Sequence, residues 1–261
     1  MKKISATVIT YNEESKIDRA LSSLRELCDE IVVVDSFSTD STLERCRRYT
    51  DRIKQRAWPG YRDQKQYATD QATHDWILSL DGDEEVGAVL CQEIQRWKES
   101  RTEADCNGYY VSRKAFFLGR AINHTTWYPD WQLRLFRKSR GKWEGGRVHE
   151  SFRVQPPTSR LRGDLHHYTY ASIDEYLEQL SRFSALAAAD SLDRGQRSGF
   201  GQLALRPLAA FFNNYLLRRG FLDGSAGFAV SVLASVSIFF KYLRLWQLQS
   251  NDRQSPFGPS G

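Results

Sequence analysis

Two short apolar runs near the N-terminus, each followed by a helical pattern, most constrain the fold of this chain. Residues 4–10 and 31–35 are rich in β-branched side chains, and residues 31–34 are apolar without alternation, as expected for a parallel strand covered on both faces. Apolar side chains recur at helical spacing through residues 17–27, and a second helix is expected over 41–49. This order predicts an α/β fold with a right-handed parallel sheet, in which ligands bind at the carboxyl ends of the strands.

A third apolar run, residues 76–80, ends in four acidic residues around one glycine. Gly82 allows the chain to turn, so that Asp81 and Asp83 can direct their carboxylates to one site. Carboxylates this close need a positive partner, and Mn²⁺ or Mg²⁺ would suit them while leaving positions for the phosphates of a substrate. The alternative is a solvated turn in which Asp83 caps the helix expected over residues 86–97.

Polar residues follow all three strands at one edge of the predicted sheet. Asn12 and Glu13 come after the first strand, Asp35 after the second and the acidic turn after the third. We expect these side chains to converge on one crevice. The chain has no Gly-x-Gly-x-x-Gly and no Gly-x-x-x-x-Gly-Lys-Ser/Thr sequence, which argues against a dinucleotide site and a P-loop NTPase.

The helix expected over residues 60–68 carries Arg62 and Lys65 three positions apart on one face. Their charges could bind a phosphate or the edge of a uracil, or form a solvated basic face. The chain as a whole has 37 Lys and Arg against 32 Asp and Glu, a balance that suits anionic partners such as nucleotides, phosphorylated glycans or a lipid surface. Four scattered cysteines and an N-terminus without a signal-peptide pattern lead us to expect the reducing, cytoplasmic side of a membrane.

Aromatic residues surround a further carboxylate before the strand expected over residues 132–137. Asp130 stands between Trp127 and Trp131, and Arg134 lies within the strand itself. Aromatic walls suit a sugar acceptor, and by limiting solvation they would raise the pKa of the carboxyl group. Asp130 is therefore a candidate site residue, with the tryptophans and Arg134 as candidate acceptor contacts. Alternatively, Asp130 only begins a turn.

Three short motifs occur in order along the chain: Thr10-Tyr11-Asn12-Glu13, then Val34-Asp35 with Ser38-Thr39-Asp40, then Leu80-Asp81-Gly82-Asp83. Together they resemble the nucleotide-sugar domain of family 2 glycosyltransferases, which have the GT-A fold. The resemblance covers about residues 3–170. It implies that a UDP-sugar binds at the strand ends, with a divalent metal ion on its diphosphate. The residues so implied are Thr10, Asn12, Glu13, Asp35 and Asp81 for the nucleotide sugar, together with Arg62 and Lys65, and Asp81 and Asp83 for the metal.

The chain departs from the family pattern in two places. The family usually has two adjacent Asp and a Gly after its second strand, where this chain has Ser36 and Phe37 following Asp35. Pro129 replaces the Glu that usually precedes the base, whose position Asp130 takes.

The resemblance also points to a Val-His-Glu sequence at residues 148–150. His149 matches a histidine that completes the metal site in many members of the family, and Glu150 is the competing candidate for the base. His166 and His167 are further candidate ligands.

The composition changes after a polar linker at residues 191–201. Residues 202–248 are apolar and basic, and the sixteen residues 225–240 carry no charge. That run is shorter than the roughly 20 residues that span a bilayer, so we expect the tail to lie in or against a membrane surface. The alternative is a pair of helices packed on the catalytic domain. The predicted division is a GT-A domain at 1–190 with nucleotide-sugar and acceptor halves meeting near residue 100, the linker, the tail and disorder over 249–261.

The sequences at 127–130, 134–137 and 148–150, with Gly-Phe-Leu-Asp-Gly at 220–224, extend the resemblance over nearly the whole chain. They are similar to the bacterial lipopolysaccharide inner-core β-1,4-glucosyltransferase group, whose members transfer glucose from a UDP-sugar to a core heptose. The implied protein is an inverting enzyme dependent on Mn²⁺ or Mg²⁺, peripheral on the inner face of the bacterial inner membrane, with a lipid-anchored glycan as acceptor and no nucleic acid partner. The alternatives are a transferase for another envelope glycan or a protein side chain, and a non-catalytic nucleotide-sugar-binding protein.

Overall fold

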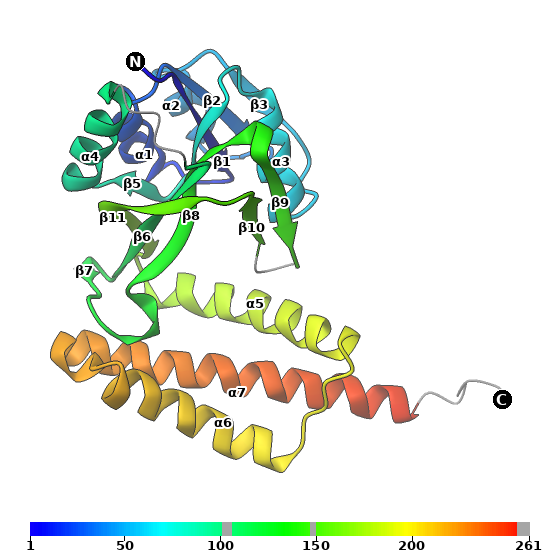
Figure 1. Cartoon of the computed structure of the whole chain (residues 1–261). Coiled ribbons are helices and arrows are strands. Elements are labelled where there is room, and N and C mark those ends of the chain that lie inside the picture. The colour runs from blue at the N-terminus through cyan, green and yellow to red at the C-terminus, as the bar shows by residue number, and fades with distance from the viewer. Residues whose placement is uncertain (101–105, 147–149, 255–261) are drawn as a thin grey trace. The chain divides into compact units, whose positions relative to one another are not determined.

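The computed structural model describes residues 1–100, 106–146 and 150–254. The chain forms two compact units, shown with their elements in Figure 1. The first unit comprises Met1–Phe116 and Pro129–Thr169, and the second comprises Phe117–Tyr128 and Tyr170–Gly261. The division differs from the predicted one, because residues 117–128 and 170–190 belong to the same unit as the C-terminal helices.

The first unit is built around a mixed sheet whose strands are ordered β3-β2-β1-β4-β8-β6-β11-β5. Its parallel part confirms the βαβ prediction, since β2 and β4 flank β1 and both run parallel to it. Strand β8 then pairs antiparallel with β4 and with β6, and β5 pairs antiparallel with β11. The strands are β1 (Ile4–Thr10), β2 (Glu30–Asp35), β3 (Ile53–Gln55), β4 (Trp76–Asp81), β5 (Glu84–Val86), β6 (Gly108–Phe117), β8 (Asp130–Arg137) and β11 (Thr158–Tyr170), with β7 (Arg120–Ala121) on β6.

Apolar side chains project from both faces of this sheet, because neighbouring residues on a strand point to opposite sides. On one face Leu78 belongs to a core that includes Leu21 and Ile94 from two helices. On the other face Ile77 packs with Phe136 and with a two-stranded ribbon. The helices of the unit are α1 (Ile17–Leu24), α2 (Thr42–Cys46), α3 (Tyr61–Gln71) and α4 (Ala88–Glu99), and the ribbon is β9 (Gly141–Gly145) with β10 (Glu150–Val154).

Two helices of this unit begin without a side-chain cap from the serine next to their first turn. Neither Ser15 nor Ser41 caps a helix with its side chain, because other groups take that place. Backbone N–H groups at the start of α1 donate to the carbonyl of Glu13, and Asp40 Oδ1 accepts from the N–H of Thr42 at 3.0 Å. Helix α4 begins after Gly87 without a side-chain cap, so the reading of Asp83 as its cap is wrong.

The second unit contains three helices that pack side by side (Figure 1). Ser172 caps α5 as the sequence suggests, since its Oγ accepts from Glu175 N at 3.1 Å. Tyr176 and Leu180 of α5 pack on Val230 of α7. This contact explains why α5 belongs to the tail. The elements are α5 (Ile173–Asp193), α6 (Phe200–Phe212), η3 (Asn213–Leu217), η4 (Gly220–Asp223) and α7 (Gly224–Gln254).

Helix α7 corrects two expectations about the C-terminus. It is 31 residues long, so residues 249–254 are helical instead of disordered, while 255–261 lie outside the described residues. The segment Gly220–Asn251 is long and apolar enough to cross a membrane by length and composition, a test that buried helices of soluble proteins also pass. The apolar helical segment is therefore longer than the sixteen-residue uncharged run indicated. Polar contacts nevertheless join α7 to α5, where the hydroxyl of Tyr176 donates to Leu233 O at 2.9 Å and Arg244 donates to Ser181 Oγ at 2.9 Å.

Phe37 has a backbone conformation that favours glycine. Its φ of 61° lies in the left-handed region, and its side chain is exposed. The resemblance noted in the sequence leads us to expect Gly at this position. Left-handed backbone costs a residue with a Cβ atom about 1–2 kcal/mol, so the turn after β2 is strained at this point.

We expect Phe37→Gly to stabilise the chain by about 0.5–1 kcal/mol, because relief of this strain exceeds the greater entropy that glycine loses on folding. Phe37→Ala is the matched control, since it removes the same ring but keeps the Cβ atom. Urea unfolding of both variants measures the difference. Equal stability of the Gly and Ala variants would show that the turn is not strained at Phe37.

Candidate active site

The polar residues that follow β1, β2 and β4 lie at one edge of the sheet, as predicted. The strands pair in register there, with Thr10 opposite Asp35 and Ile9 opposite Asp81. Backbone hydrogen bonds to β1 continue one residue beyond the ends of β2 and β4. Ser36 N donates to Thr10 O at 2.9 Å, and Gly82 N donates to Ile9 O at 3.0 Å. A Cβ atom on Gly82 would lie 3.0 Å from Thr10 Oγ1, so the acidic turn passes directly over the end of β1.

Asp35 is fully buried at the end of β2. Its Oδ2 accepts from Ser38 N at 3.0 Å and from Gln55 Nε2 at 3.1 Å, and its Oδ1 accepts from the Ser38 hydroxyl. Asn12 closes the same turn from the other side, because its Oδ1 accepts from Thr39 N at 2.8 Å. These bonds hold the first two predicted motifs together as one rigid loop pair.

Glu13 precedes α1, and its side chain lies beside the acidic turn, because a Cβ atom on Gly82 would lie 3.4 Å from Glu13 Cγ. Its N–H donates to Thr42 Oγ1 at 2.8 Å, and its carboxylate lies 3.6 Å from Lys16 Nζ. The motif Thr10-Tyr11-Asn12-Glu13 therefore joins β1 to both α1 and the loop after β2.

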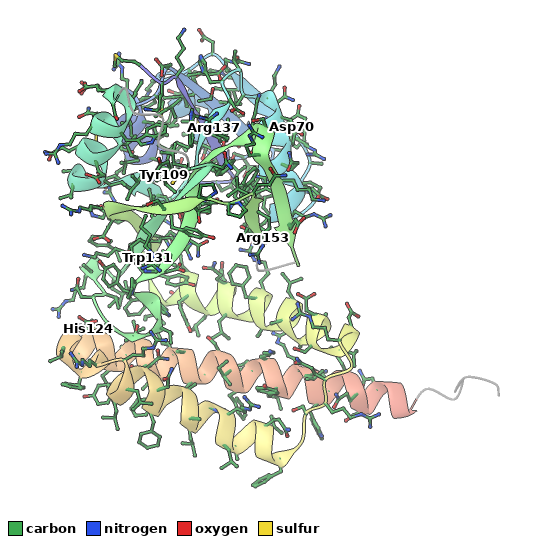
Figure 2. The ribbon with its side chains drawn as sticks, in the orientation of Figure 1. Asp70, Tyr109, His124, Trp131, Arg137 and Arg153 are labelled. Atoms are coloured by element: carbon green, nitrogen blue, oxygen red, sulfur yellow. The ribbon has the colours of Figure 1, made fainter. Side chains whose placement is uncertain are left out.

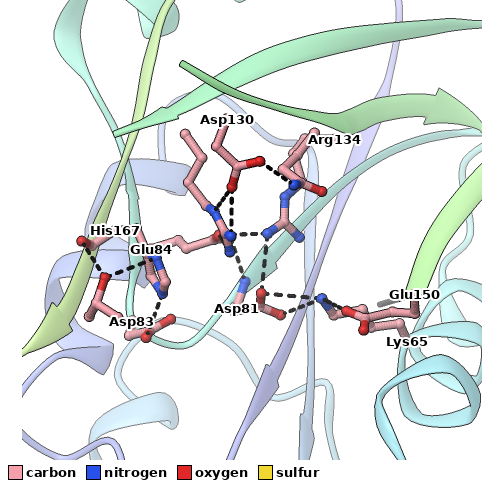
Figure 3. A network of polar contacts seen from close by, with 11 residues as sticks. Lys65, Asp81, Asp83, Glu84, Asp130, Arg134, Glu150 and His167 are labelled. Atoms are coloured by element: carbon pink, nitrogen blue, oxygen red, sulfur yellow. Dashed lines mark hydrogen bonds and ion pairs between the residues drawn. The ribbon is translucent and has the colours of Figure 1, made fainter. Parts of the chain in front are cut away.

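A network of ion pairs, mostly buried, holds the acidic turn in place (Figure 3). Glu84 is completely buried, and one of its oxygens accepts from Asp81 N at 2.9 Å while the other lies 2.5 Å from an Arg134 nitrogen. The same Arg134 nitrogen lies 3.1 Å from Asp81 Oδ2. Burial lowers the pKa of Arg134, but the two carboxylates outweigh it and raise the pKa above its usual value. The sequence analysis made Arg134 a candidate acceptor contact. In the structure Arg134 pairs with Asp81 and Glu84 at the acidic turn.

Lys65 joins Asp81 to Glu150, which comes from β10. Its ammonium nitrogen lies 2.9 Å from Asp81 Oδ1 and 2.8 Å from Glu150 Oε1, and its side chain is only 4% exposed. Burial alone would raise the pKa of Asp81, but the charges of Lys65 and Arg134 hold that pKa well below its usual range. Arg62 does not share this position, because it is half exposed and pairs with Asp63 at 2.7 Å. The solvated basic face suggested for this helix is thus wrong for Lys65.

Asp130 is held at the start of β8 by an arginine that the sequence did not single out. Two nitrogens of Arg113 lie 2.8 and 2.7 Å from Asp130 Oδ2, and Gln132 Nε2 donates to Asp130 Oδ1 at 2.7 Å. Arg113 also lies 3.6 Å from Glu84, so the same network reaches Asp130 and the acidic turn. With 28% of its side chain exposed, Asp130 is oriented yet open to solvent.

Asp83 pairs with a histidine from β11. Asp83 Oδ2 lies 3.0 Å from His167 Nε2, and Thr169 Oγ1 lies 3.1 Å from His167 Nδ1. Burial disfavours the charged carboxylate, but the charge and hydrogen bond of His167 lower the pKa of Asp83. His149 lies outside the described residues. Within the described ranges, no group of three or more His, Cys, Asp and Glu side chains is placed to hold a metal ion.

The predicted tryptophans lie in different units. Trp131 belongs to β8 in the first unit, where the guanidinium of Arg160 stacks 4.3 Å from its ring. Trp127 belongs to the second unit and packs against Phe117 and Tyr170, with ring centroids 6.0 and 6.1 Å away.

Two residues at the site escaped the sequence analysis. Glu84 was noted only as part of the acidic run, and Arg113 was not considered. A weak signal existed for Arg113, because it is a charged residue inside an aromatic, β-rich segment. Its partners come from β5 and β8, which the strand pattern did not pair with it.

A separate pocket of about 480 Å³ lies at the other ends of the strands. Glu30, the first residue of β2, lines it together with Arg52 and His74. None of the predicted site residues contributes to it, and ion pairs already join these three side chains.

We expect Glu84→Gln to destabilise the chain by about 3 kcal/mol, because it leaves the buried charge of Arg134 with one carboxylate fewer. Glu44→Gln is the control. It removes an exposed pair with Arg48 at 3.4 Å and should cost about 0.5 kcal/mol or less. Urea unfolding measures both changes, and a loss below 1 kcal/mol for Glu84→Gln would contradict the role of the network.

Comparison with known proteins identifies the family. A family model described as glycosyl transferase family 2 matches residues 5–155. The lipopolysaccharide core biosynthesis glycosyltransferase LpsC of Rhizobium meliloti is 28% identical over 251 residues, covering 94% of this chain and 92% of that protein. The uncharacterized glycosyltransferase RT0209 of Rickettsia typhi is 27% identical over 262 residues, covering 97% and 90%.

Among solved structures, that of S. aureus TarS 1–349 in complex with UDP covers 99% of this chain and 94% of its own, with 15% identity and a TM-score of 0.47. The family model alone spans more than half of the sequence. The chain therefore belongs to glycosyl transferase family 2, and the α/β fold of the GT-A kind that its sequence predicts is confirmed.

Proposed function

We propose that this glycosyltransferase moves a hexose, glucose in the first instance, from a UDP-sugar to a heptose of the lipopolysaccharide inner core with inversion at the anomeric carbon. The observation that carries the proposal is the similarity to LpsC, which extends over nearly the full length of both chains. The family supplies the reaction class, and this relative supplies the acceptor class.

The end of the parallel sheet supports a nucleotide-sugar site. Asp35 and Asn12 are fixed in rigid turns, and the acidic turn crosses the end of β1 beside them. Two buried polar atoms there, Thr10 Oγ1 and Arg134 Nε, have no hydrogen-bond partner among the described residues. Buried polar groups are normally paired, so such atoms favour a polar ligand at this edge.

The donor set at the acidic turn fits a divalent cation. Asp83 offers a carboxylate and His167 an imidazole nitrogen 3.0 Å away, and Asp81 is the next carboxylate along the turn. Cations that carry a nucleotide diphosphate need only one or two protein ligands, because phosphates and water fill the other positions. Asp83 and Asp81 would hold Mn²⁺ or Mg²⁺, with an imidazole from His167 or His149. When bound, the cation offsets the negative charge of the leaving diphosphate.

Asp130 is the better placed of the two candidate bases. Glu150 is 11% exposed and bound to Lys65, whereas Asp130 is 28% exposed and is oriented from both sides by Arg113 and Gln132. In the proposed step Asp130 takes the proton of an acceptor hydroxyl as its oxygen bonds to the anomeric carbon from the face opposite UDP. The bond from that carbon to the diphosphate oxygen breaks, and its electron pair leaves with UDP.

The second unit supports a membrane-bound acceptor. Large apolar side chains are exposed along α6, η3, η4 and the start of α7, and exposed arginines lie among them. An apolar surface with cationic side chains suits the interface of an anionic leaflet. We propose that this surface lies on the cytoplasmic leaflet that carries the lipid-anchored acceptor. The apolar residues are Leu205, Leu208, Phe212, Leu216, Leu217, Phe221, Leu222 and Phe228, and the arginines are Arg206, Arg218 and Arg219.

The chemical proposal predicts different effects of two isosteric changes. Asp130→Asn should lower turnover by about 10²- to 10⁴-fold, the usual contribution of a general base, while UDP-sugar binding stays nearly intact. Glu150→Gln should cost less, with part of the loss in acceptor affinity. Transfer is measured with saturating UDP-glucose, Mn²⁺ and a heptose-bearing core acceptor. If Glu150→Gln abolished transfer and Asp130→Asn retained it, the base would be Glu150.

The same assay tests the acceptor class. Transfer by the native chain to core lipopolysaccharide, above the rate of UDP-glucose hydrolysis without acceptor, is the expected result. Hydrolysis without transfer to any heptose-bearing acceptor would move the proposal to another envelope glycan or a protein acceptor, and neither activity would favour a non-catalytic nucleotide-sugar-binding protein.

For the membrane surface we expect the double change Leu217→Glu and Leu222→Glu to abolish flotation with anionic vesicles. Each buried leucine contributes about 2 kcal/mol, so the bound fraction should fall more than tenfold. Leu177→Glu on α5, where the side chain is also exposed, is the matched control and should float like the native chain. Equal flotation of the double variant would refute this membrane surface and favour helices that only pack within the protein.

A further inference from the structure

The loop formed by residues 122–128, between β7 and β8, is bound by the α6–α7 hairpin through its backbone. Four consecutive N–H groups of this loop donate to the hairpin, which lies in the same unit. The donors and acceptors are Asn123 N to Asp223 Oδ2 at 3.1 Å, His124 N to Asp223 Oδ2 at 2.9 Å, Thr125 N to Arg218 O at 3.0 Å and Thr126 N to Asn214 Oδ1 at 2.8 Å. The backbone of the loop is therefore fixed by residues almost a hundred positions later.

Two of the acceptors are buried polar side chains. The side chain of Asp223 is 5% exposed and Asn214 is 3% exposed. The second carboxylate oxygen of Asp223 lies 2.9 Å from Nδ1 of His124, the residue labelled on this loop in Figure 2. Burying a carboxylate and an amide costs free energy unless their hydrogen bonds are satisfied, and the loop satisfies them.

The loop itself is strained, which shows that its shape depends on these bonds. Thr125 has φ of 69° although it carries a branched side chain, and it is almost completely buried. Left-handed backbone at such a residue persists only where the surroundings impose it. In this conformation the Thr125 hydroxyl accepts a hydrogen bond from Trp127 N at 3.1 Å. The strained backbone at Thr125 therefore helps to fix the backbone position of Trp127.

The glycines of the hairpin make this approach possible. A Cβ atom on Gly220 would lie 2.9 Å from Thr125 Cγ2 and 2.8 Å from Asn214 O. A Cβ atom on Gly227 would lie 1.8 Å from Gly220 O, so α7 can begin against η4 only with glycine there. The Gly-Phe-Leu-Asp-Gly sequence thus builds a close contact between the hairpin and the loop, in addition to any role beside a membrane.

We infer that Asp223 and Asn214 are positioning residues: they fix the loop of their own unit that carries Trp127, the residue expected from the sequence to contact the acceptor. The loop that they hold carries Trp127 and continues through Pro129 into Asp130, the first residue of β8. Loss of the hairpin contacts would free this loop, while the donor residues at the ends of β1, β2 and β4 belong to other parts of the chain. This inference rests on the proposed function, because it assigns the loop to the acceptor.

The test compares Asp223→Ala and Asp223→Asn with the control Glu178→Ala, which removes an exposed carboxylate from α5 in the same unit. With UDP-glucose, Mn²⁺ and a heptose-bearing core acceptor, Asp223→Ala should lower kcat/KM for the acceptor by about 10- to 100-fold, as misplacement by about 1 Å does. Its affinity for UDP in the presence of Mn²⁺, measured by titration calorimetry, should stay within twofold. Asp223→Asn keeps an oxygen for the two backbone N–H groups and should recover most of the loss.

Hydrogen exchange of the full chain tests the contact independently of any acceptor. Amides 123 and 124 should exchange slowly in the native chain and faster in Asp223→Ala, while the amides of β1 and β4 keep their native rates. If the native chain transfers sugar to no core acceptor, the proposed function fails, whereas this exchange result still decides the contact. Native acceptor kinetics in folded Asp223→Ala would overturn the inference, and so would a loss of UDP affinity equal to the loss of transfer.

Discussion

The completely buried carboxylate of Glu84 is the constraint on which the candidate site depends. It stands one residue beyond the acidic turn and binds the backbone of Asp81 from one oxygen and Arg134 from the other. A carboxylate in this position is stable only because Arg134 and Arg113 neutralise it. Through these two arginines the position of one buried charge fixes both the acidic turn and Asp130.

The network also gives the site its electrical character. Its cations are Lys65, Arg113 and Arg134, and its carboxylates are Asp81, Glu84, Asp130 and Glu150, so one negative charge is in excess among them. Asp83 lies outside it with His167 as its partner. Asp81 is held by Lys65 and Arg134, and Asp83 is held by His167, so both carboxylates of the proposed cation site have their positions fixed by cationic or imidazole partners.

Much of the first unit could be predicted from sequence because its signals are local. Short apolar or β-branched runs marked β1, β2 and β4, and the parallel arrangement of these strands then followed from the helices between them. The long strand β11 could not be predicted, since its arginines, aspartate and histidines alternate with few buried residues. The burial of Lys65 was equally invisible. One of its two partners, Glu150, comes 85 residues later, and nothing in the helix pattern shows that a distant strand will cover it.

The dependence of residues 122–128 on the hairpin has a consequence for the order in which the protein is made. His124 and the Asp223 that binds it are separated by 99 residues, and synthesis proceeds from the N-terminus. The strands that carry the donor residues leave the ribosome and can begin to fold long before the hairpin exists. During this interval the loop beside Asp130 has no partners for its backbone N–H groups. Under the function proposed above, the strands of the nucleotide-sugar site are therefore synthesised well before the hairpin that fixes the loop carrying Trp127.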